Sequence, residues 1–348
     1  MVNLILQTAY LGDLLLSIPL MREFRKLYPD HKLILGCRAG FEEPFLAAGL
    51  VDEVISVNKT NSPSVRAFRK KLLKYEYDVV LSPHESMRSG LLVQSLKANK
   101  KVGFKKWWNA WIFDSRVERP MQRPDALRQL QLLAPLNSNW NEILGEVSVL
   151  NITDNNTVGP WPSGSVPTWS QMRIDHLLPE FQSAHAGATF LSPGSVWPTK
   201  RWGFNKFVEL GKRLSEEGRQ IIVTGGRDER ALCESVQKQI PGALLWAGEK
   251  SLLESLQEFR FGSLMVTNDS GAMHMAACVG LPVVSVFGPT TLSLGYRPWQ
   301  EQAIVVQKDL SCRPCGRHGS KKCPIGTHDC MKQISVDSVL DAAKTLSH

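Results

Sequence analysis

Residues 264–290 have the sequence LMVTNDSGAMHMAACVGLPVVSVFGPT. The apolar run at 264–267 is short and bounded, and a second, β-branched run at 283–287 ends at Gly288-Pro289. Between the two runs, residues 270–279 are small and compatible with a helix. The stretch therefore predicts a strand, a loop, a helix and a second strand.

In such a unit the loop lies at the carboxyl end of the first strand, where open parallel sheets bind their ligands. Asn268, Asp269 and Ser270 are good N-cap residues, and Gly271 lets a ligand approach the backbone closely. His274 follows Ser270 by one turn on the same helix face. The loop is therefore a candidate phosphate site. The alternative is a well-capped helix in which His274 is a polar group satisfied by a neighbour.

The composition is that of a globular chain with a basic surplus. Its 348 residues are 43% hydrophobic and 21% charged, which is enough for two domains of ordinary size. A net charge of +8 favours an acidic partner, namely a nucleotide, a phosphorylated glycan, an anionic membrane face or nucleic acid, unless it serves only solubility.

Residues 4–20 are the most apolar segment near the start of the chain, but Gln7, Gly12, Asp13 and Pro19 interrupt them. The segment is therefore neither a spanning helix nor a signal peptide. We expect a cytoplasmic protein.

The first half of the chain alternates between strands and helices. We expect strands at 2–7, 32–36, 54–57, 78–81 and 101–104, and helices at 13–28, 42–48, 64–75 and 86–96. This alternation predicts a parallel, doubly wound sheet. Asp13 then stands at the start of the first helix, over the carboxyl edge of the sheet, where an N-cap role alone could explain it.

A second alternating series follows. We expect strands at 188–191, 220–224, 244–247 and 304–306, and helices at 204–217, 228–239, 252–259 and 336–346, besides the unit at 264–290. Residues 137–187 break the pattern and are rich in Gly and Pro around 158–167, which is typical of a linker. We predict an N-terminal Rossmann-like domain at 1–165 and a C-terminal one at 166–348, with a substrate cleft between the two domains. The last helix packs either on the C-terminal domain or back on the N-terminal one.

Two basic clusters occur in the first half. One is the helix with Arg66, Arg69, Lys70, Lys71 and Lys74; the other comprises Lys97, Lys100, Lys101, Lys105 and Lys106 and leads into Trp107, Trp108 and Trp111. Lysine with interleaved indole suits an anionic interface, so we expect contact with a membrane surface or an acceptor. A solvated lysine face with core tryptophans is the alternative, and no nucleic-acid motif accompanies the clusters.

Two further loops in the second half carry chemistry. The loop at 192–202 contains Ser195, Lys200 and Arg201, and the two cations could neutralise a diphosphate unless they are ordinary surface residues. The loop at 224–229 contains Gly225-Gly226, and its Asp228 and Glu229 could accept from ribose hydroxyls. Neither G-x-G-x-x-G nor G-x-x-x-x-G-K-[ST] follows any strand, which argues against a standard dehydrogenase and a P-loop NTPase.

Taken together, these motifs resemble those of the ADP-heptose–lipopolysaccharide heptosyltransferases, most closely the heptosyltransferase II branch, over nearly the whole chain. The set consists of Gly12-Asp13, Ser192-Pro-Gly-Ser195, Lys200-Arg-Trp202, Gly225-Gly226, Thr267-Asn-Asp-Ser-Gly271 with His274, and Phe287-Gly-Pro-Thr290. The resemblance implies an inverting, metal-independent GT-B glycosyltransferase with two Rossmann-like domains facing a central cleft. The N-terminal domain would hold the acceptor and the C-terminal domain the ADP-sugar. No Asp-x-Asp motif occurs in the chain, which agrees with metal independence.

The resemblance also assigns roles. Asp13 would be the general base that removes a proton from the acceptor hydroxyl, and Lys200, with the helix dipole after Ser270, would meet the charge that develops on ADP. Asp269 and His274 match the nucleotide-sugar motif of the family. Asp269 and Glu229 would both accept hydrogen bonds from the sugar or the ribose. Thr8 and Ser195 are lesser candidates.

Four cysteines lie close together near the C-terminus. Cys312, Cys315, Cys323 and Cys330 have a spacing that would admit a structural zinc, with His318 and His328 as competing ligands. Disulfides and free thiols are the alternatives. The odd total of seven cysteines does not favour a secreted disulfide scaffold.

We therefore predict an enzyme that moves heptose from ADP-L-glycero-D-manno-heptose to the lipopolysaccharide inner core at the cytoplasmic face of the inner membrane, without a cofactor and without nucleic acid. One alternative is the same transfer to another acceptor, such as a protein. The others are a non-catalytic nucleotide-sugar-binding protein and, through the basic clusters, a nucleic-acid-binding protein.

Overall fold

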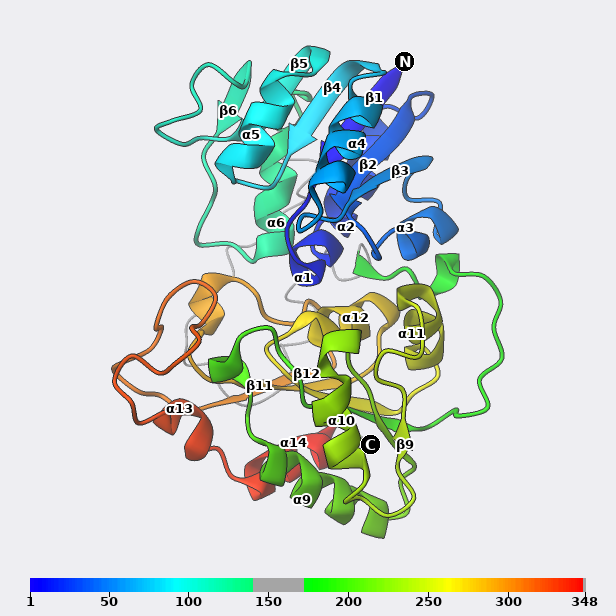
Figure 1. The fold of residues 1–348 in the computed structure, drawn as a ribbon, viewed down its shortest axis with the longest axis vertical. Coiled ribbons are helices and arrows are strands. Elements are labelled where there is room, and N and C mark those ends of the chain that lie inside the picture. Colours follow the sequence, from blue (N-terminus) through cyan, green and yellow to red (C-terminus); the bar gives the residue numbers. More distant parts are fainter. Residues whose placement is uncertain (140–171, 347–348) are drawn as a thin grey trace. The chain divides into compact units, whose positions relative to one another are not determined.

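The computed structural model describes residues 1–139 and 172–346, which form two α/β units (Figure 1). The first unit contains the described residues up to 139 together with Met172 and residues 177–179. The second contains residues 173–176 and the described residues from Glu180 onward. Most of the predicted linker at 137–187 lies outside the described residues.

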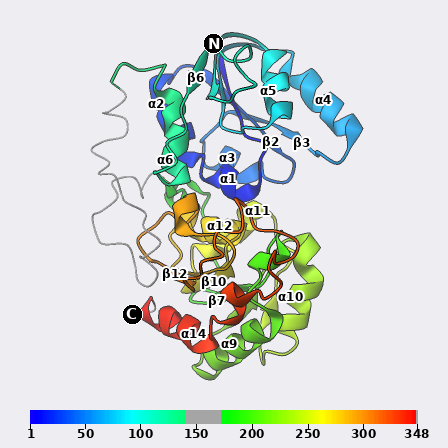
Figure 2. The ribbon, with the colours of Figure 1, turned by 90° about the vertical axis from the view of Figure 1, so that its left-hand side faces the viewer.

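The first unit is built on a six-stranded sheet in the order β3-β2-β1-β4-β5-β6, with every neighbouring pair parallel. Its strands are β1 (Val2–Leu6), β2 (Lys32–Arg38), β3 (Glu53–Val57), β4 (Glu76–Ser82), β5 (Lys97–Phe104) and β6 (Ser115–Val117). Its helices are α1 (Leu11–Leu15), α2 (Ile18–Leu27), α3 (Glu43–Ala47), α4 (Ser62–Leu72), α5 (Met87–Gln94) and α6 (Asp125–Leu130). Figure 2 shows α2 and α6 on one side of this sheet and α4 and α5 on the other.

The second unit repeats this topology with the order β12-β11-β10-β7-β8-β9, again all parallel. Its strands are β7 (Thr189–Ser192), β8 (Ile221–Val223), β9 (Leu244–Leu245), β10 (Leu264–Asn268), β11 (Val283–Phe287) and β12 (Ala303–Gln307). Its helices are α9 (Phe204–Glu216), α10 (Arg230–Gln237), α11 (Leu252–Phe259), α12 (Gly271–Val279), α13 (Asp329–Lys332) and α14 (Val336–Thr345). The final helix α14 packs on α9, β11 and β12.

Burial of β-branched and aromatic side chains explains both sheets. In the second unit, one core joins the strand residues Val223, Val266 and Val284 to the inner faces of α9, α10 and α14. The helix α12 is buried over nearly its whole length, from Met273 to Val279, so it needs small residues rather than an amphipathic pattern. It ends at Gly280, whose φ of 70° only glycine adopts without strain.

Each sheet has a switch point at which the strand order reverses. The reversal falls between β1 and β4 in the first sheet and between β7 and β10 in the second. In open α/β sheets, ligands bind outside the carboxyl ends of the strands at such a point. The loops after β1 and β4, and those after β7 and β10, are therefore the positions at which to look for chemistry.

The structure corrects one predicted helix and adds one strand, β6, and two helices, α6 and α13. The helix predicted at 13–28 is broken between Leu15 and Ile18, because Pro19 has no N–H to donate and fits only the first turn of a new helix. No pattern in the sequence predicts β6, which has only three residues, or α6. All six residues of α6 are buried, and Asp125, Arg128 and Gln129 among them are polar or charged, so the helix lacks the separate apolar and polar faces by which an amphipathic helix is predicted.

Most of the lysine-rich segment 97–106 is strand β5, which begins four residues before the strand expected at 101–104. Trp107 and Trp111 are 90% and 65% exposed, whereas Trp108 packs on the core of the first unit. Lys97, Lys105 and Lys106 each form an ion pair with a glutamate. The segment is thus partly a core element and partly an exposed indole surface.

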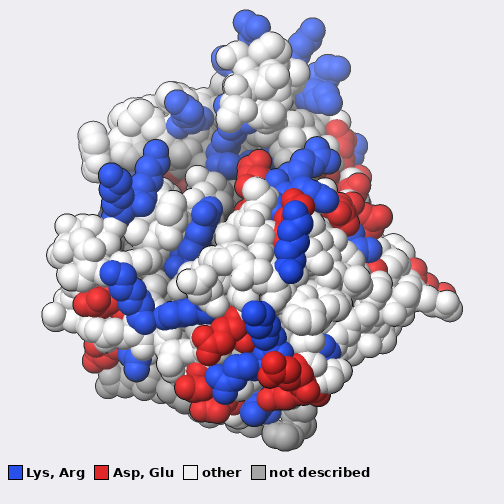
Figure 3. Space-filling view, turned by 60° about the horizontal axis from the view of Figure 1, so that its bottom comes forward, with Lys and Arg blue, Asp and Glu red and all other residues white. Residues whose placement is uncertain are grey.

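The basic surplus is not spread evenly. The predicted basic residues on and just after α4, Arg66, Arg69, Lys70, Lys71 and Lys74, are all exposed. By contrast, acidic and basic side chains are interspersed over the lower part of the face in Figure 3, which brings the lower end of Figure 1 forward. In the second unit, Arg213 of α9 pairs with Asp337, and Lys344 of α14 pairs with Glu217. Among the described residues, no helix is long and apolar enough to cross a membrane.

Candidate functional site

Thr8 and His84 meet at the switch point of the first sheet. Thr8 directly follows β1, and its Oγ1 lies 3.0 Å from His84 Nδ1 and 3.3 Å from Ser89 Oγ. Burial, followed by the nearby cations Lys59 and Arg38, lowers the pKa of His84 to about 4. His84 is therefore a neutral hydrogen-bonding group at ordinary pH, and Thr8 is held as part of this edge.

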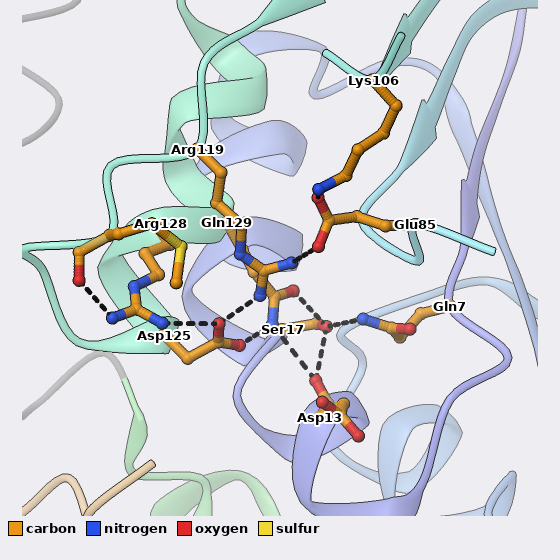
Figure 4. Close-up of polar contacts among 10 residues, drawn as sticks. Gln7, Asp13, Ser17, Glu85, Lys106, Arg119, Asp125, Arg128 and Gln129 are labelled. Atoms are coloured by element: carbon orange, nitrogen blue, oxygen red, sulfur yellow. Dashed lines mark hydrogen bonds and ion pairs between the residues drawn. The ribbon is translucent and has the colours of Figure 1, made fainter. Parts of the chain in front are cut away.

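Asp13 lies in the first turn of α1, the helix that follows β1. Its Oδ2 accepts a hydrogen bond from the backbone N–H of Tyr10 at 3.2 Å. Tyr10 is the N-cap residue of α1, so Asp13 caps the helix from its third position and is not the N-cap residue that the sequence suggested. Burial, and then the negative charge of Asp125, raise the pKa of Asp13 to about 6, although Arg119 opposes the rise. Figure 4 shows Asp13 with the polar groups that surround it. A carboxylate with this proton affinity is well matched to general-base chemistry near neutral pH.

Three cations, Arg38, Lys59 and Arg88, lie together at this edge of the sheet, and Lys59 interacts with Asp13. Arg38 ends β2, donates to the carbonyl of Thr8 at 3.2 Å and stacks on the ring of Tyr10. Lys59 follows β3, and its pKa is lowered to about 8 by partial burial and by Arg38 and Arg88, while Asp13 opposes the shift. The carboxyl edge of the first sheet thus combines one carboxylate of raised pKa with a group of positive charges.

Lys200, Asp269 and Thr290 meet at the switch point of the second sheet. Lys200 follows β7, Asp269 follows β10 and Thr290 follows β11. Lys200 Nζ donates to Asp269 Oδ2 at 2.6 Å, and Thr290 Oγ1 donates to the same oxygen at 2.5 Å. All three residues are buried, so the alternative that Lys200 is an ordinary surface residue is wrong.

Asn268 connects the two loops of this switch point. Its Oδ1 accepts from the backbone N–H of Trp202 at 2.9 Å, and its Nδ2 donates to the carbonyls of Pro193 and Gly194 at 2.9 and 3.0 Å. These bonds hold the loop that carries Lys200 against the end of β10. The structure gives Asn268 a supporting role, and a direct ligand contact stays a prediction.

The N-terminus of α12 directly follows Asp269, the residue that pairs with Lys200. Ser270 is its N-cap residue, with an extended backbone and its Oγ 3.1 Å from Thr267 Oγ1, and Gly271 is the first helical residue. Helix N-termini present unpaired N–H groups and a positive dipole end to an anion. His274 is a buried residue of the same helix, and its contact with a nucleotide sugar stays a prediction.

Glu229 packs over two glycines at the edges of β7 and β8. Its Oε2 accepts from the N–H of Gly226 at 3.0 Å. A Cβ built at Gly194 would lie 2.2 Å from the carboxyl carbon of Glu229, and one at Gly225 would lie 3.1 Å from Oε2. The glycines are therefore required so that the Glu229 carboxylate can lie against the loop after β7. Ser195 in that loop is buried, and its carbonyl accepts from Arg201 Nε at 3.0 Å.

Replacing Gly194 by alanine is expected to displace the carboxylate end of Glu229, break its hydrogen bond with the N–H of Gly226 and lower the free energy of unfolding by about 0.5–1.5 kcal/mol, the range of one hydrogen bond. Urea denaturation followed by tryptophan fluorescence measures the effect. Gly226→Ala is the matched control, because its Cβ would meet nothing closer than Glu229 Oε2 at 3.8 Å. Equal stability of the two variants would contradict the close approach at Gly194.

Residues 308–330, the cysteine loop, support the loops around Lys200 and Thr290. His328 Nε2 lies 2.7 Å from the carbonyl of Thr199, and Thr199 Oγ1 donates to the carbonyl of Ser320 at 2.7 Å. The N–H of Cys315 donates to the carbonyl of Pro289 at 2.9 Å. The cysteine loop therefore fixes the segments that flank the second switch point.

The cysteines themselves are free thiols, so the disulfide alternative is not what the structure contains. Cys323 Sγ accepts from the N–H of His328 at 3.4 Å, and such backbone donors lower the pKa of Cys323, while burial raises that of Cys330 to about 11. Within residues 1–139 and 172–346, no three His, Cys, Asp or Glu side chains form a group that could hold a metal ion.

The predicted site residues thus form two groups, one in each unit. Thr8 and Asp13 belong to the first, and the others belong to the second, where Lys200 and Asp269 are in direct contact. The sequence interpretation missed Arg38, Lys59, His84 and Thr290. Each follows a predicted strand closely, so the carboxyl-edge rule applied to every strand would have found them.

A comparison with known protein families tests the resemblance to the heptosyltransferases. Residues 65–325, more than half of the chain, match the model described as glycosyltransferase family 9 (heptosyltransferase). The chain belongs to glycosyltransferase family 9. Membership agrees with the resemblance seen in the motifs at 192–202 and 264–290.

A curated relative of this family 9 protein is lipooligosaccharide heptosyltransferase 2 of Campylobacter jejuni. The two are 33% identical over 162 residues, which is 45% of this chain and 50% of the relative. The chain therefore spans about half the length of that relative in the alignment.

Two solved structures share the fold of the family 9 protein over their whole length. The family 9 glycosyl transferase of Veillonella parvula is 20% identical, with a TM-score of 0.78 and coverage of 99% of this chain and 97% of that chain. The Escherichia coli ADP-heptose lps heptosyltransferase II is 22% identical, with a TM-score of 0.73 and coverage of 100% and 98%. These matches confirm the predicted GT-B fold class, with its two parallel-sheet α/β domains.

Proposed function

We propose that this family 9 protein transfers heptose from ADP-L-glycero-D-manno-heptose to a sugar hydroxyl of the lipopolysaccharide inner core, with inversion and without a divalent metal. The family description and the names of its relatives support the heptosyl and lipopolysaccharide parts of the proposal. The observation that carries the mechanism is Asp13, a carboxylate of raised pKa at the switch point of the first sheet.

The first domain binds the acceptor in this proposal. An acceptor hydroxyl is a poor nucleophile until a base removes its proton, and Asp13 does so as the bond to the anomeric carbon forms. Arg38, Lys59 and Arg88 supply positive charge beside Asp13. They suit an acceptor whose sugars carry carboxylate or phosphate groups, and would hold such an acceptor with its hydroxyl near the base.

The second domain binds the donor. The departing ADP develops negative charge on its diphosphate, and Lys200 with the N-terminus of α12 at Ser270 and Gly271 meets that charge in place of a metal ion. Since Lys200 and Thr290 both donate to Oδ2 of Asp269, the other carboxylate oxygen is the one assigned to a donor hydroxyl. Glu229 is assigned to the ribose, with Gly225 giving the backbone room to approach.

Contact with the cytoplasmic face of an anionic membrane is part of the proposal, because lipopolysaccharide precursors are anchored in a bilayer. Two exposed features of the first domain support it. One is the row of five cations on and just after α4, and the other is the pair of exposed indoles, Trp107 and Trp111. Cations attract the anionic surface and indoles enter the headgroup region.

The proposal is tested by measuring ADP release from ADP-heptose, with and without heptose-deficient lipopolysaccharide core, in the presence of EDTA. Acceptor-dependent turnover is expected to survive EDTA. If ADP-heptose binds tightly but no core acceptor is used, the acceptor assignment is wrong. If ADP-heptose does not bind, the donor assignment fails as well, and loss of turnover in EDTA would refute metal independence.

The pH dependence of the reaction follows from Asp13. Because the base acts in its ionised form and its pKa is about 6, kcat/KM is expected to rise through pH 6 and to level off above about pH 7. An ordinary aspartate would give a plateau that extends below pH 5. A rate profile measured from pH 4.5 to 8.5 in constant ionic strength distinguishes the two, and a flat profile down to pH 5 would contradict the raised pKa.

A further inference from the structure

A chain of buried hydrogen bonds connects Asp13 to helix α6 (Figure 4). Gln129 Nε2 donates to the backbone carbonyl of Asp13 at 3.3 Å and to Asp125 Oδ2 at 2.9 Å. Ser17 Oγ lies 2.5 Å from Gln129 Oε1 and 3.0 Å from the Asp13 carbonyl oxygen. The same Ser17 Oγ accepts a hydrogen bond from Gln7 Nε2 at 3.3 Å. The turn that carries Asp13 is therefore fixed by Gln7 just after β1, Ser17 just before α2 and Gln129 of α6.

Beyond Gln129 the contacts continue as a row of alternating charges. Asp125 is paired with Arg119 and lies 3.9 Å from Arg128, while Arg119 pairs at 2.5 Å with Glu85, whose other oxygen pairs at 2.6 Å with Lys106. Apart from Lys106, these side chains are at most 12% exposed. With Asp13 included, the cluster holds three carboxylates and three cations, so the charges balance when Asp13 is ionised.

Such a cluster is costly to bury and is weak evidence for stability alone. Three of its members, Arg119, Asp125 and Arg128, come from segments that the sequence does not mark as a core, namely α6 and the stretch between β6 and α6. The hydrogen bonds of Gln129 and Ser17 connect this cluster to the backbone carbonyl of Asp13, the residue assigned to catalysis. This placement indicates a role in the reaction.

We propose that the Arg119–Asp125 ion pair, connected to Asp13 through Gln129 and Ser17, is a positioning unit that sets how readily the Asp13 carboxylate takes up a proton. The proposal rests on the proposed function of Asp13 as general base. It assigns no contact with substrate to these residues while the pair is intact, and it places them among the residues that determine the working pH range.

The two members of the pair act on Asp13 with opposite signs. After burial, the negative charge of Asp125 is the next cause of the raised pKa of Asp13, and Arg119 opposes it. Asp125 itself stays ionised, because Arg119 and the Gln129 amide outweigh the effect of burial on its pKa. In the wild type the two charges act in opposite directions, so removal of either one exposes the effect of the other.

Other charged groups face Asp13 from neighbouring elements, and they are the same in every variant compared. Lys59 after β3 interacts with Asp13 directly, and Arg38 and Arg88 lie beside Lys59. His84 is neutral, and Glu85 is paired within the cluster. A change in the titration of Asp13 between variants therefore reports the Arg119–Asp125 pair.

The test compares Asp125→Asn with Arg119→Gln. Each variant leaves the remaining member a partner, because Arg119 keeps Glu85, and Asp125 keeps Gln129 and Arg128. Asp125→Asn is expected to lower the pKa of Asp13 by about one unit, and Arg119→Gln to raise it by about one unit. The direct measurement is the ¹³C carboxyl titration of Asp13 in aspartate-labelled protein, with its resonance assigned by its loss in Asp13→Asn.

The acid limb of kcat/KM is expected to move with these pKa values, to lower pH in Asp125→Asn and to higher pH in Arg119→Gln. Arg119→Lys, which keeps the charge, is expected to retain the wild-type titration even if the altered geometry lowers kcat. Asp30→Asn, a change at an exposed aspartate of the same domain, is the control.

Opposite shifts support the proposal, because a merely structural role would lower stability or kcat without moving the titration in two directions. Shifts in the same direction, or none, overturn it. The carboxyl titration needs no substrate, so it is independent of the proposed function. If the wild type transfers no heptose but the titrations shift as expected, the enzyme assignment fails while the charge coupling stands.

Discussion

Asp13→Asn is expected to lower kcat for heptose transfer by about 10²–10⁴-fold, with little change in the affinity for the ADP-sugar. Asparagine has nearly the shape of aspartate and can still accept from the N–H of Tyr10, so the start of α1 should be preserved. It cannot accept a proton from the acceptor hydroxyl. The loss should therefore appear in kcat and not in donor binding.

Single-turnover transfer and titration calorimetry with ADP measure the two quantities separately. Asp30→Asn is the matched control, since it removes one exposed carboxylate of the same domain. A rate within threefold of wild type for Asp13→Asn would show that another group is the base, or that the protein binds the nucleotide sugar without catalysing transfer. A parallel loss of ADP affinity would indicate that Asp13 acts on binding.

Lys200→Met is expected to lower kcat by about 10²–10³-fold, the range found when one preorganised group that stabilises transition-state charge is removed. Methionine keeps an unbranched apolar stem like that of lysine but cannot offset the charge on the departing diphosphate. Activity with a donor whose leaving group is less basic should be reduced less than activity with ADP-heptose, because less charge then needs stabilisation.

A second effect of the same substitution must be separated from catalysis. Lys200→Met also leaves the buried carboxylate of Asp269 with Thr290 but without its cation, and breaking a buried pair in this way is strongly destabilising. The double variant Lys200→Met/Asp269→Asn removes that problem. It should regain stability in urea denaturation but not activity.

Recovery of activity in the double variant would mean that Lys200 serves only to neutralise Asp269. Lys212→Met, on the exposed face of α9, controls for the loss of one positive charge. Lys200→Arg should keep part of the activity, because it restores the charge with a different shape.

The parallel-sheet class, the presence of two domains and most element positions follow from the sequence alone. Alternating apolar runs and amphipathic stretches specify strands and helices locally, and the unit at 264–290 was predicted almost to the residue. The motif residues Lys200, Asp269 and Glu229 also stand out, because they lie in the loops that follow buried strands, where ligands bind in open parallel sheets.

What the sequence by itself did not determine is which of these residues meet. The contact between Lys200 and Asp269, 69 positions apart, exists because β7 and β10 are neighbours at the switch point, and strand order is a property of the folded sheet. Helix α6 is not predicted by the sequence for a related reason. Its buried side chains include Asp125, Arg128 and Gln129, and these charges can be buried only because Arg119 and Glu85, from other segments, pair with them. Local pattern reflects the hydrophobic effect, whereas these polar contacts depend on partners that only the tertiary structure brings together.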